Sequence, residues 1–336
     1  MGWSTTDIGN LAGRIAVVTG ANGGLGLETT RELARHGAHV VMAVRSREKA
    51  AAVREALAAE IPGGSLEIVT LDLAALASVR EAADAILAAH PVVDILVNNA
   101  GVMGIGYGTT ADGFEMQLGV NHLGHFVLTA LLTPALLRSR GARVVSVTST
   151  ARFLGRPIDA TDPQMRRYDP WRAYGRSKIA DLQFAVELSR RLAAAGSPAR
   201  ACAADPGFSH TDLQARSARE APGLSQRFFD TTVGWFGTAP ATGALPQLRA
   251  ATDPRARGGT LFGLRFVVGG PPIRNPYAAR GMKPADLAAM WSISERMTGV
   301  TFDVAAGPAS VSPEADVAAG MVPGMPASPT GACSDG

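Results

Sequence analysis

The hydrophobic pattern along the chain alternates short apolar runs with longer stretches of helical periodicity. The apolar runs predict six buried strands, at residues 15–18, 40–44, 66–71, 93–97, 143–147 and 200–204. Apolar residues three and four positions apart predict the helices between them, at 25–35, up to about Glu60, and at 77–89, 113–138 and 174–194. Helical crossovers make consecutive strands parallel and are right-handed. The pattern therefore predicts an α/β fold: one doubly wound parallel sheet with helices on both faces.

The pattern changes beyond Pro206. Residues 209–237 combine polar residues with four aromatic side chains and are expected to cap a substrate pocket or to form a surface helical hairpin. A helix at 239–250, a strand at 261–268 and a helix at 284–297 are expected to follow. From Gly307 onward Gly and Pro supply 10 of 30 residues, with no aromatic residue, Lys or Arg. We therefore expect one domain at 1–306 and a disordered tail at 307–336.

Composition narrows the class of protein. The chain has 336 residues, of which 46% are hydrophobic, enough for a large core. Its net charge is +3 without a dense basic run, so no nucleic-acid partner is expected. No apolar run reaches the ~20 residues of a membrane span, and the first ten residues do not resemble a secretory signal. Two cysteines cannot form a disulfide framework, so a cytoplasmic location is expected.

A glycine-rich loop follows the first predicted strand and opens a helix. It reads Thr19-Gly20-Ala21-Asn22-Gly23-Gly24-Leu25-Gly26. Glycines let the backbone approach a pyrophosphate, and the N-terminus of a helix attracts negative charge. A plain turn would look similar, but this position in a βαβ unit favours a dinucleotide site.

The end of the second predicted strand bears on which dinucleotide binds. This segment reads Ala43-Val44-Arg45-Ser46-Arg47, with no acidic residue before Glu48. NAD enzymes usually place an acid here for the ribose hydroxyl, whereas an arginine suits the 2′-phosphate of NADP. The sequence predicts NADP(H) rather than NAD(H), the alternative being two solvated arginines that open a helix.

Tyr174 and Lys178 lie four residues apart at the start of a predicted helix, and thus on one face. A nearby ammonium stabilises a phenolate and lowers the pKa of the phenol, which suits proton transfer. On spacing alone, a surface tyrosine and a surface lysine would be the better interpretation.

Further motifs in chain order reverse that judgement. They are Asp72-Leu73, Asn98-Asn99-Ala100-Gly101, Asn121 on the long helix, Ser149 after the fifth strand, and Pro206-Gly207 with Thr211 after the sixth. With the glycine-rich loop and the Tyr174–Lys178 pair, they make the chain resemble the classical short-chain dehydrogenase/reductases. Ala43-Val44-Arg45 and residues 167–174 resemble the retinol-dehydrogenase-like branch. The resemblance implies a Rossmann-type sheet.

The resemblance also implies roles for four catalytic residues. Tyr174 would be the general acid for carbonyl reduction, and Lys178 would hold the nicotinamide ribose and lower the tyrosine pKa. Ser149 would hydrogen-bond the substrate oxygen. Asn121 would kink its helix and hold a water in a proton relay through Lys178.

The resemblance assigns the cofactor contacts as well. The expected cofactor-binding residues are Gly20, Asn22, Gly24, Leu25, Gly26, Arg45, Asp72, Leu73, Asn99, Ala100, Gly101, Tyr174, Lys178, Pro206, Gly207 and Thr211. No metal is expected at His122, His125 or His210, since no acid or Cys completes a set in sequence.

The expected function is that of a cytoplasmic NADP(H)-dependent oxidoreductase acting on a ketone or aldehyde and the corresponding alcohol of a fairly apolar small molecule. A homodimer or homotetramer is expected from the resemblance. Gly23 also makes the loop fit the pattern of extended-type epimerases and dehydratases, so a nucleotide-sugar enzyme is one alternative. A non-catalytic NADP-sensing protein is the other. Residues 152–172 form an insertion that is expected to border the substrate pocket.

Overall fold

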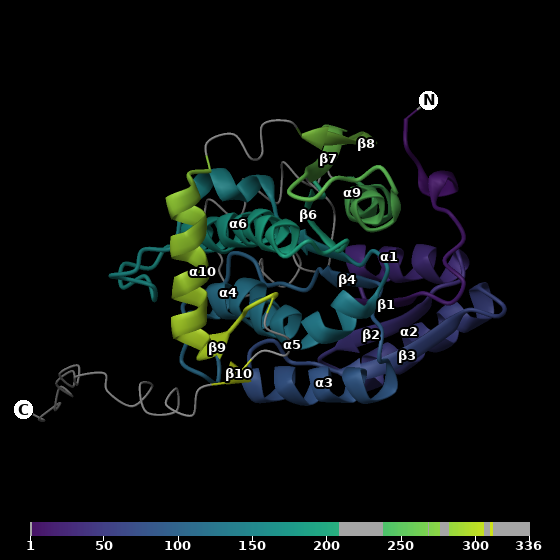
Figure 1. Ribbon diagram of the computed structural model, residues 1–336, viewed down its shortest axis with the longest axis horizontal. Coiled ribbons are helices and arrows are strands. Elements are labelled where there is room, and N and C mark those ends of the chain that lie inside the picture. Colours follow the sequence, from purple (N-terminus) through teal and green to yellow (C-terminus); the bar gives the residue numbers. More distant parts are fainter. Residues whose placement is uncertain (1, 208–237, 268, 276–281, 306–309, 312–336) are drawn as a thin grey trace, which may run out of the picture.

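The structure, a computed structural model, describes residues 2–207, 238–267, 269–275, 282–305 and 310–311 (Figure 1). Its centre is an eight-stranded sheet in the order β3-β2-β1-β4-β5-β6-β7-β8. The strands through β7 pair in parallel, and β8 pairs antiparallel to β7. Their bounds are β1 Ile15–Thr19, β2 His39–Val44, β3 Ser65–Thr70, β4 Ile95–Asn98, β5 Arg143–Val147, β6 Arg200–Asp205, β7 Leu261–Phe266 and β8 Gly269–Asn275. The predicted doubly wound sheet is confirmed.

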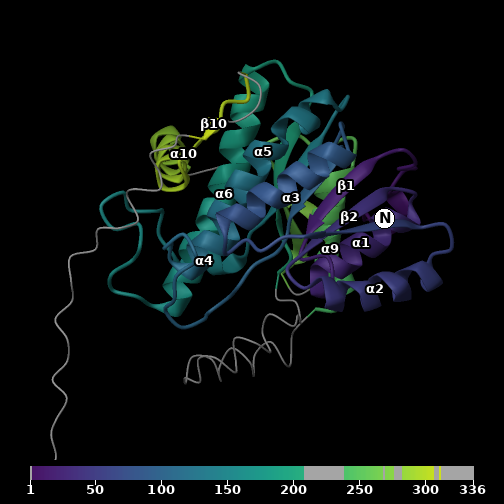
Figure 2. The ribbon, with the colours of Figure 1, turned by 90° about the horizontal axis from the view of Figure 1, so that it is seen from below.

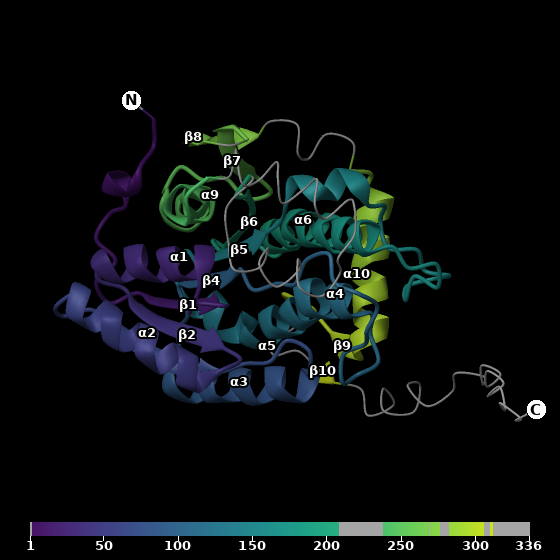
Figure 3. The ribbon, with the colours of Figure 1, turned by 180° about the vertical axis from the view of Figure 1, so that it is seen from behind.

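Helices cover both faces of this sheet (Figure 1). They are α1 Gly24–Arg35, α2 Arg47–Glu60 and α9 Pro240–Thr252 on one face, and α3 Leu76–Ala89, α5 Gly124–Arg138 and α6 Pro170–Ala194 on the other. Each face has its own hydrophobic core. Figure 3 shows α1 and α9 above the strands and α3 below them. Because the central strands are covered on both faces, most of their residues are apolar, which explains their visibility in the sequence.

The helix predicted at 113–138 is instead broken into three parts. A short helix, α4 (Met116–Leu118), leads into a π-helical segment at Gly119–Leu123, and α5 follows. Nearly every residue here is buried, so the sequence shows no periodicity that could reveal the wider turn. Met116–Arg138 is also long and apolar enough to cross a membrane, contrary to expectation. However, 78% of its most apolar 18-residue stretch is buried inside the fold, as is usual for a core helix of a globular domain.

The strand predicted at 261–268 is part of a hairpin that the sequence did not reveal. Its partner β8 carries Pro271 and Pro272 and lies at the edge of the sheet. Proline cannot donate a ladder hydrogen bond, which confines it to such edges and hides the strand in the sequence.

The C-terminal region differs from the predicted disorder at two residues. Ser310–Val311 forms strand β10, which pairs antiparallel with β9 (Val300–Thr301). The other residues of the predicted tail that lie outside the described ranges are not tested, and neither is the predicted cap at 209–237.

An aromatic cluster fixes the last helix, α10 (Pro284–Thr298), against the helices α5 and α6. Trp291 of α10 is fully buried beside Phe126 of α5, Phe184 of α6 and Phe302. The guanidinium carbon of Arg191 lies 4.1 Å from the centre of the Trp291 ring. Figure 2 shows α10 nearly end-on beside α6. Burial of large rings and a cation over indole both stabilise this contact.

We expect Trp291→Ala to lower the free energy of unfolding by about 3–5 kcal/mol, because it leaves a cavity among the other three rings. Urea unfolding followed by circular dichroism measures the loss. The control is Leu154→Ala, since Leu154 is 55% exposed and its loss should change stability by less than about 0.5 kcal/mol. Equal effects of the two variants would contradict the assigned role of the cluster.

Candidate active site

The sequence motifs converge on one edge of the sheet. Thr19 ends β1, Asn98 ends β4, and Asp205 ends β6, while Ser149 lies two residues beyond β5. Parallel strands bring these carboxyl ends together. The strand order also reverses between β1 and β4, which leaves a crevice where α/β sheets bind ligands.

The glycine-rich loop forms a close-fitting turn at this reversal. Gly20 has a φ of +66°, which favours glycine. A Cβ on Gly26 would lie 2.2 Å from the carbonyl oxygen of Gly20 and 2.6 Å from Asn99 Nδ2. Helix α1 begins here, and no side chain caps it at Gly23. Its first N–H groups and its positive end therefore fit the pyrophosphate of a dinucleotide.

The Thr19 hydroxyl connects three elements of the site. Its Oγ1 accepts hydrogen bonds from the N–H groups of Asn99 and Ala100, both at 2.9 Å, and lies 2.9 Å from His125 Nε2. His125 Nδ1 lies 2.7 Å from the carbonyl oxygen of Asn121, which can only accept. Nδ1 is therefore protonated and Nε2 accepts the Thr19 proton. Burial lowers the pKa of His125 to about 4, so the ring is neutral.

Asn121 lies in the π-helical segment, at the irregularity that the resemblance implied. Its Oδ1 accepts from the Val102 N–H at 2.8 Å. Its Nδ2 donates to the Val102 carbonyl at 2.9 Å and to Ser177 Oγ at 2.8 Å. Asn121 thus joins the loop after β4 to α6. Both polar atoms of its side-chain amide are engaged by protein groups, and the implied water relay stays a prediction.

Helix α6 presents both Tyr174 and Lys178. The helix begins with Pro170 after the N-cap Asp169, whose side chain accepts from the Arg172 N–H. Tyr174 and Lys178 are both buried, and Lys178 Nζ lies 5.8 Å from the centre of the Tyr174 ring. Lys178 Nζ donates to the Val147 carbonyl and to Asp181 Oδ2, both at 2.9 Å.

The electrostatic balance at Tyr174 differs from the expected one. Burial raises the pKa of Tyr174 above its ordinary value, although Lys178 and a hydrogen bond with Ser149 both act to lower it. Burial also acts to lower the pKa of Lys178, but the charge and hydrogen bond of Asp181 together with the charges of Tyr174 and Asp205 outweigh it, and the pKa is raised. The site therefore holds a neutral phenol beside a charged ammonium, which makes Tyr174 a proton donor at neutral pH.

Asp181 is a site residue that the motifs did not identify. It lies one turn beyond Lys178, and its Oδ1 is 3.7 Å from His122 Nδ1. Its signal in the sequence was an acid three residues after the lysine, on the same helix face. His122 Nε2 also contacts Ser294 Oγ at 2.8 Å, so His122 and His125 each have their own protein partners.

The residues expected around the adenosine end of the cofactor differ in their burial and in their hydrogen-bond partners. Asp72 binds the N-terminus of α3, since its N–H donates to Ser78 Oγ and its Oδ1 accepts from the Ala74 N–H, both at 3.0 Å. Leu73 is buried. Arg45 is exposed at the end of β2 and makes no hydrogen bond or ion pair with any residue that the structure describes. Its guanidinium is therefore available to an anion.

The remaining predicted contacts lie in the same region or outside the described residues. Asn22, Gly24 and Leu25 are half-buried in the glycine-rich loop. Gly101 is so close to Asn121 Oδ1 that a Cβ would lie 3.0 Å from it. Gly207 has a φ of +68° and donates to Asp205 Oδ1, just after Pro206. Thr211 and His210 lie outside the described residues.

The insertion at 152–172 folds against the start of α6, close to Tyr174. A pair of glycines permits this: a Cβ on Gly175 would lie 2.5 Å from the Gly155 nitrogen. The Tyr168 hydroxyl donates to the Ile105 carbonyl at 2.8 Å, which ties the insertion to the loop after β4. Phe153 and Leu154, close to Ser149 in the chain, are 78% and 55% exposed. We call this exposed apolar surface, four and five residues beyond Ser149 in the chain, the apolar rim.

Comparison with known proteins agrees with this geometry. The family model of the short chain dehydrogenases matches residues 14–222. Retinol dehydrogenase 13 of Homo sapiens is 37% identical over 298 residues, which cover 86% of this chain and 86% of that protein. Polyprenol dehydrogenase of Mus musculus is 39% identical over 297 residues, which cover 85% and 84%.

Solved structures give the same result. An uncharacterized protein from Mycobacterium Paratuberculosis is 42% identical with a TM-score of 0.70, and the match covers 88% of this chain and 97% of that one. A structure described as an NAD(P) dependent gluconate 5-dehydrogenase from Beutenbergia cavernae, with bound NADP at low occupancy, is 26% identical with a TM-score of 0.60. That match covers 76% and 96% of the two chains.

Because His125 is buried and neutral, we expect the folded state to lose stability in acid. The pKa of His125 falls from 6.5 to about 4 on folding, so the unfolded chain binds more protons between these values. The contribution of His125 to the free energy of unfolding is fully present above pH 6.5. It is lost as the pH falls toward 4, by about 3 kcal/mol in all.

Urea unfolding at several pH values measures this loss in the native chain and in His125→Gln. The variant should be less stable at pH 7 but should lose less stability between pH 7 and pH 4. His36→Gln, at a half-buried histidine outside this network, is the control. The same pH dependence in the native chain and in His125→Gln would refute the assignment.

Proposed function

Because this chain belongs to the short-chain dehydrogenase family, we propose that it is an NADP(H)-dependent oxidoreductase that interconverts a ketone or aldehyde and the corresponding alcohol of a fairly apolar small molecule. One observation carries the proposal. The neutral phenol of Tyr174 lies within hydrogen-bond reach of Ser149 and beside the charged Lys178, at the edge of the sheet where the glycine-rich loop fits a dinucleotide.

The arrangement provides acid catalysis of carbonyl reduction. When bound, NADPH supplies the hydride that the carbonyl carbon accepts. The Ser149 hydroxyl and the Tyr174 phenol hydrogen-bond to the carbonyl oxygen and orient it. As negative charge develops on that oxygen, Tyr174 donates its proton. The ammonium of Lys178 stabilises the phenolate left behind, and Asp181 keeps that ammonium charged and in place.

The preference for NADP(H) rests on the end of β2. Arg45 is exposed there, and no acidic residue precedes Glu48 to accept a hydrogen bond from a ribose 2′-hydroxyl. A guanidinium binds a phosphate through two parallel hydrogen bonds, which a hydroxyl cannot match. The bound NADP in the related gluconate 5-dehydrogenase structure supports this choice.

The proposed substrate class rests on the apolar rim. Phe153 and Leu154 offer apolar surface close to Ser149 in the chain. Retinol and polyprenol, the alcohols in the names of two relatives, are both long and apolar.

We place the enzyme in the cytoplasm, because its membrane-length segment, Met116–Arg138, is mostly buried in the core.

We expect Tyr174→Phe to reduce carbonyl turnover by about 100-fold or more, since it removes the proton donor and keeps the ring. NADPH oxidation followed at 340 nm across aldehydes, ketones and quinones measures this, and NADPH binding should change little. Tyr107→Phe is the matched control, because Tyr107 is 61% exposed. Turnover of a nucleotide sugar without net cofactor oxidation would instead favour an epimerase or dehydratase. NADPH binding with no turnover of any substrate class would favour a sensing protein.

We expect Arg45→Ala to weaken NADPH binding by about 10- to 100-fold, the effect of losing a charged hydrogen bond to phosphate. NADH binding should change little, so the variant should lose most of its discrimination. Fluorescence titration of both cofactors measures this. Arg140→Ala, at an exposed position just beyond α5, controls for loss of net charge. An equal loss of NADH and NADPH binding would contradict the assignment.

A further inference from the structure

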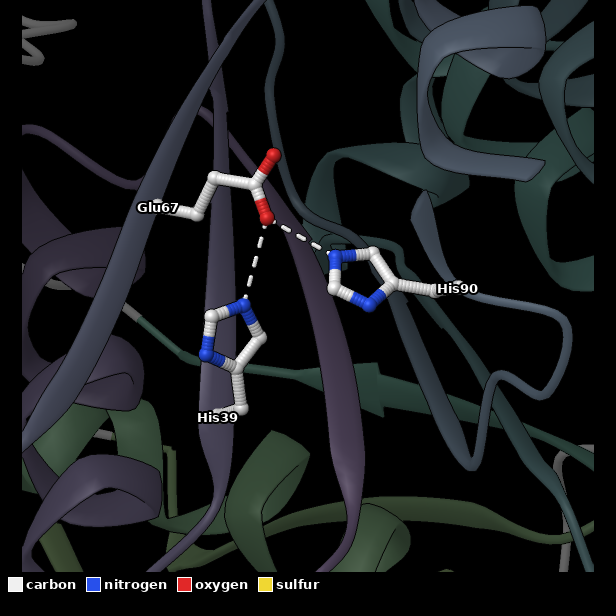
Figure 4. A group of neighbouring side chains, drawn as sticks. All are labelled: His39, Glu67 and His90. Carbon is white, nitrogen blue, oxygen red and sulfur yellow. Dashed lines mark hydrogen bonds and ion pairs between the residues drawn. The ribbon is translucent and has the colours of Figure 1, made fainter. Parts of the chain in front are cut away.

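Three side chains converge far from the candidate active site. His39 begins β2, Glu67 lies in β3, and His90 is the residue that ends α3. Glu67 Oε2 lies 3.2 Å from His39 Nε2 and 2.8 Å from His90 Nε2 (Figure 4). All three side chains are partly exposed. His39 lies at the amino end of its strand, opposite the edge that carries Ser149 and Tyr174.

The fold brings the three together, although they are 28 and 23 residues apart in sequence. Parallel pairing sets His39 opposite Ser65, and Glu67 shares the face of Ser65 because side chains alternate along a strand. Helix α3 covers the same face and ends at His90. Figure 4 shows both imidazole rings turned toward the carboxylate.

We propose that His39, Glu67 and His90 form a binding site for a divalent transition-metal ion, with Zn²⁺ the best match. Two imidazole nitrogens and one carboxylate are a characteristic zinc donor set, with a fourth position left to water. One ligand atom from each residue lies within 4.8 Å of the others. Nitrogen donors favour zinc over Mg²⁺ and Ca²⁺, which prefer oxygen.

The surroundings of the cluster suit a cation. The Glu67 carboxylate supplies an oxygen donor between the two imidazole rings. Ser65 Oγ lies 2.7 Å from His39 Nδ1 and orients the ring from behind. Without an ion, His39 Nε2–H donates to the Glu67 carboxylate, which can only accept. When the Ser65 hydroxyl accepts a proton on Nδ1, Nε2 can release its own proton and bind an ion through its lone pair, as metal ligation requires. The C-terminal end of α3 adds partial negative charge beside His90.

A bound ion would join β2, β3 and the end of α3. Such an ion binds the folded state and not the separated elements, so it would raise stability with the logarithm of its concentration above the dissociation constant. Because the cluster lies at the opposite end of the strands from Tyr174, the role is structural and does not depend on the proposed function.

The test is a calorimetric titration of the tag-free chain with Zn²⁺, and separately with Mg²⁺, at pH 7.5. The titrated protein has the substitution Cys333→Ser, which removes a thiol that would compete for Zn²⁺. We expect about one equivalent of Zn²⁺ to bind and to raise the melting temperature, with no binding of Mg²⁺. Co²⁺ should give the visible absorption of a low-coordinate site.

Two variants and a control locate the ion. His90→Gln and Glu67→Gln should each weaken Zn²⁺ binding by at least about tenfold and abolish the rise in melting temperature. His36→Gln should bind Zn²⁺ as the native chain does, since His36 Nδ1 contacts the Glu32 carbonyl elsewhere on the surface. Far-UV circular dichroism verifies that each variant is folded. Absence of Zn²⁺ binding, or equal binding by folded His90→Gln, would overturn the proposal.

Discussion

The hydroxyl group of Thr19 occupies the point on which the rest of the site depends. It lies where the strand order reverses, between β1 and β4, and it bonds to the loop after β4 and to His125 of α5. The His125 ring continues the connection to the carbonyl of Asn121, and the Asn121 side chain continues it to Val102 and Ser177. A chain of short polar contacts thus holds the floor of the site at a fixed geometry. Because these groups are buried, leaving any one of them unpaired would be costly.

Above this floor, burial and charge act against each other at Tyr174. Burial alone would make its proton hard to lose, and Lys178 supplies the compensating charge. The charge of Asp181 acts in the same surroundings to keep Lys178 protonated. The three residues lie on successive turns of α6, so one helix carries the donor, the stabilising cation and the counter-charge. The insertion reaches them because Gly155 and Gly175 allow two backbones to touch.

The sequence revealed those parts of the molecule whose signal is local. Strands such as β1 and β4 are covered on both faces and are therefore mostly apolar, and motifs at their ends must meet because the strands are parallel. The wide turn around Asn121 left no trace in the hydrophobic pattern, since every side of that segment is buried, and only the family resemblance implied a kink there. Proline hid β8. Asp181 was missed because its effect on Lys178 depends on the burial of both side chains. The His39–Glu67–His90 cluster was missed because its residues are far apart in sequence and are brought together by the pairing of β2 with β3. We expected Lys178 to lower the pKa of Tyr174, but burial raises it. The spacing of the two residues in the sequence does not reveal how deeply Tyr174 is buried.

The dependence of kcat/KM on pH, measured in both reaction directions, tests the central claim that Tyr174 acts as a neutral acid beside a charged lysine. Because the pKa of Tyr174 is raised, carbonyl reduction should stay constant across neutral pH and fall only in alkaline solution, as the phenol loses its proton. Alcohol oxidation, which needs the phenolate, should rise over the same alkaline range. A reduction rate that instead falls through neutral pH, or an oxidation rate independent of alkaline pH, would contradict the account.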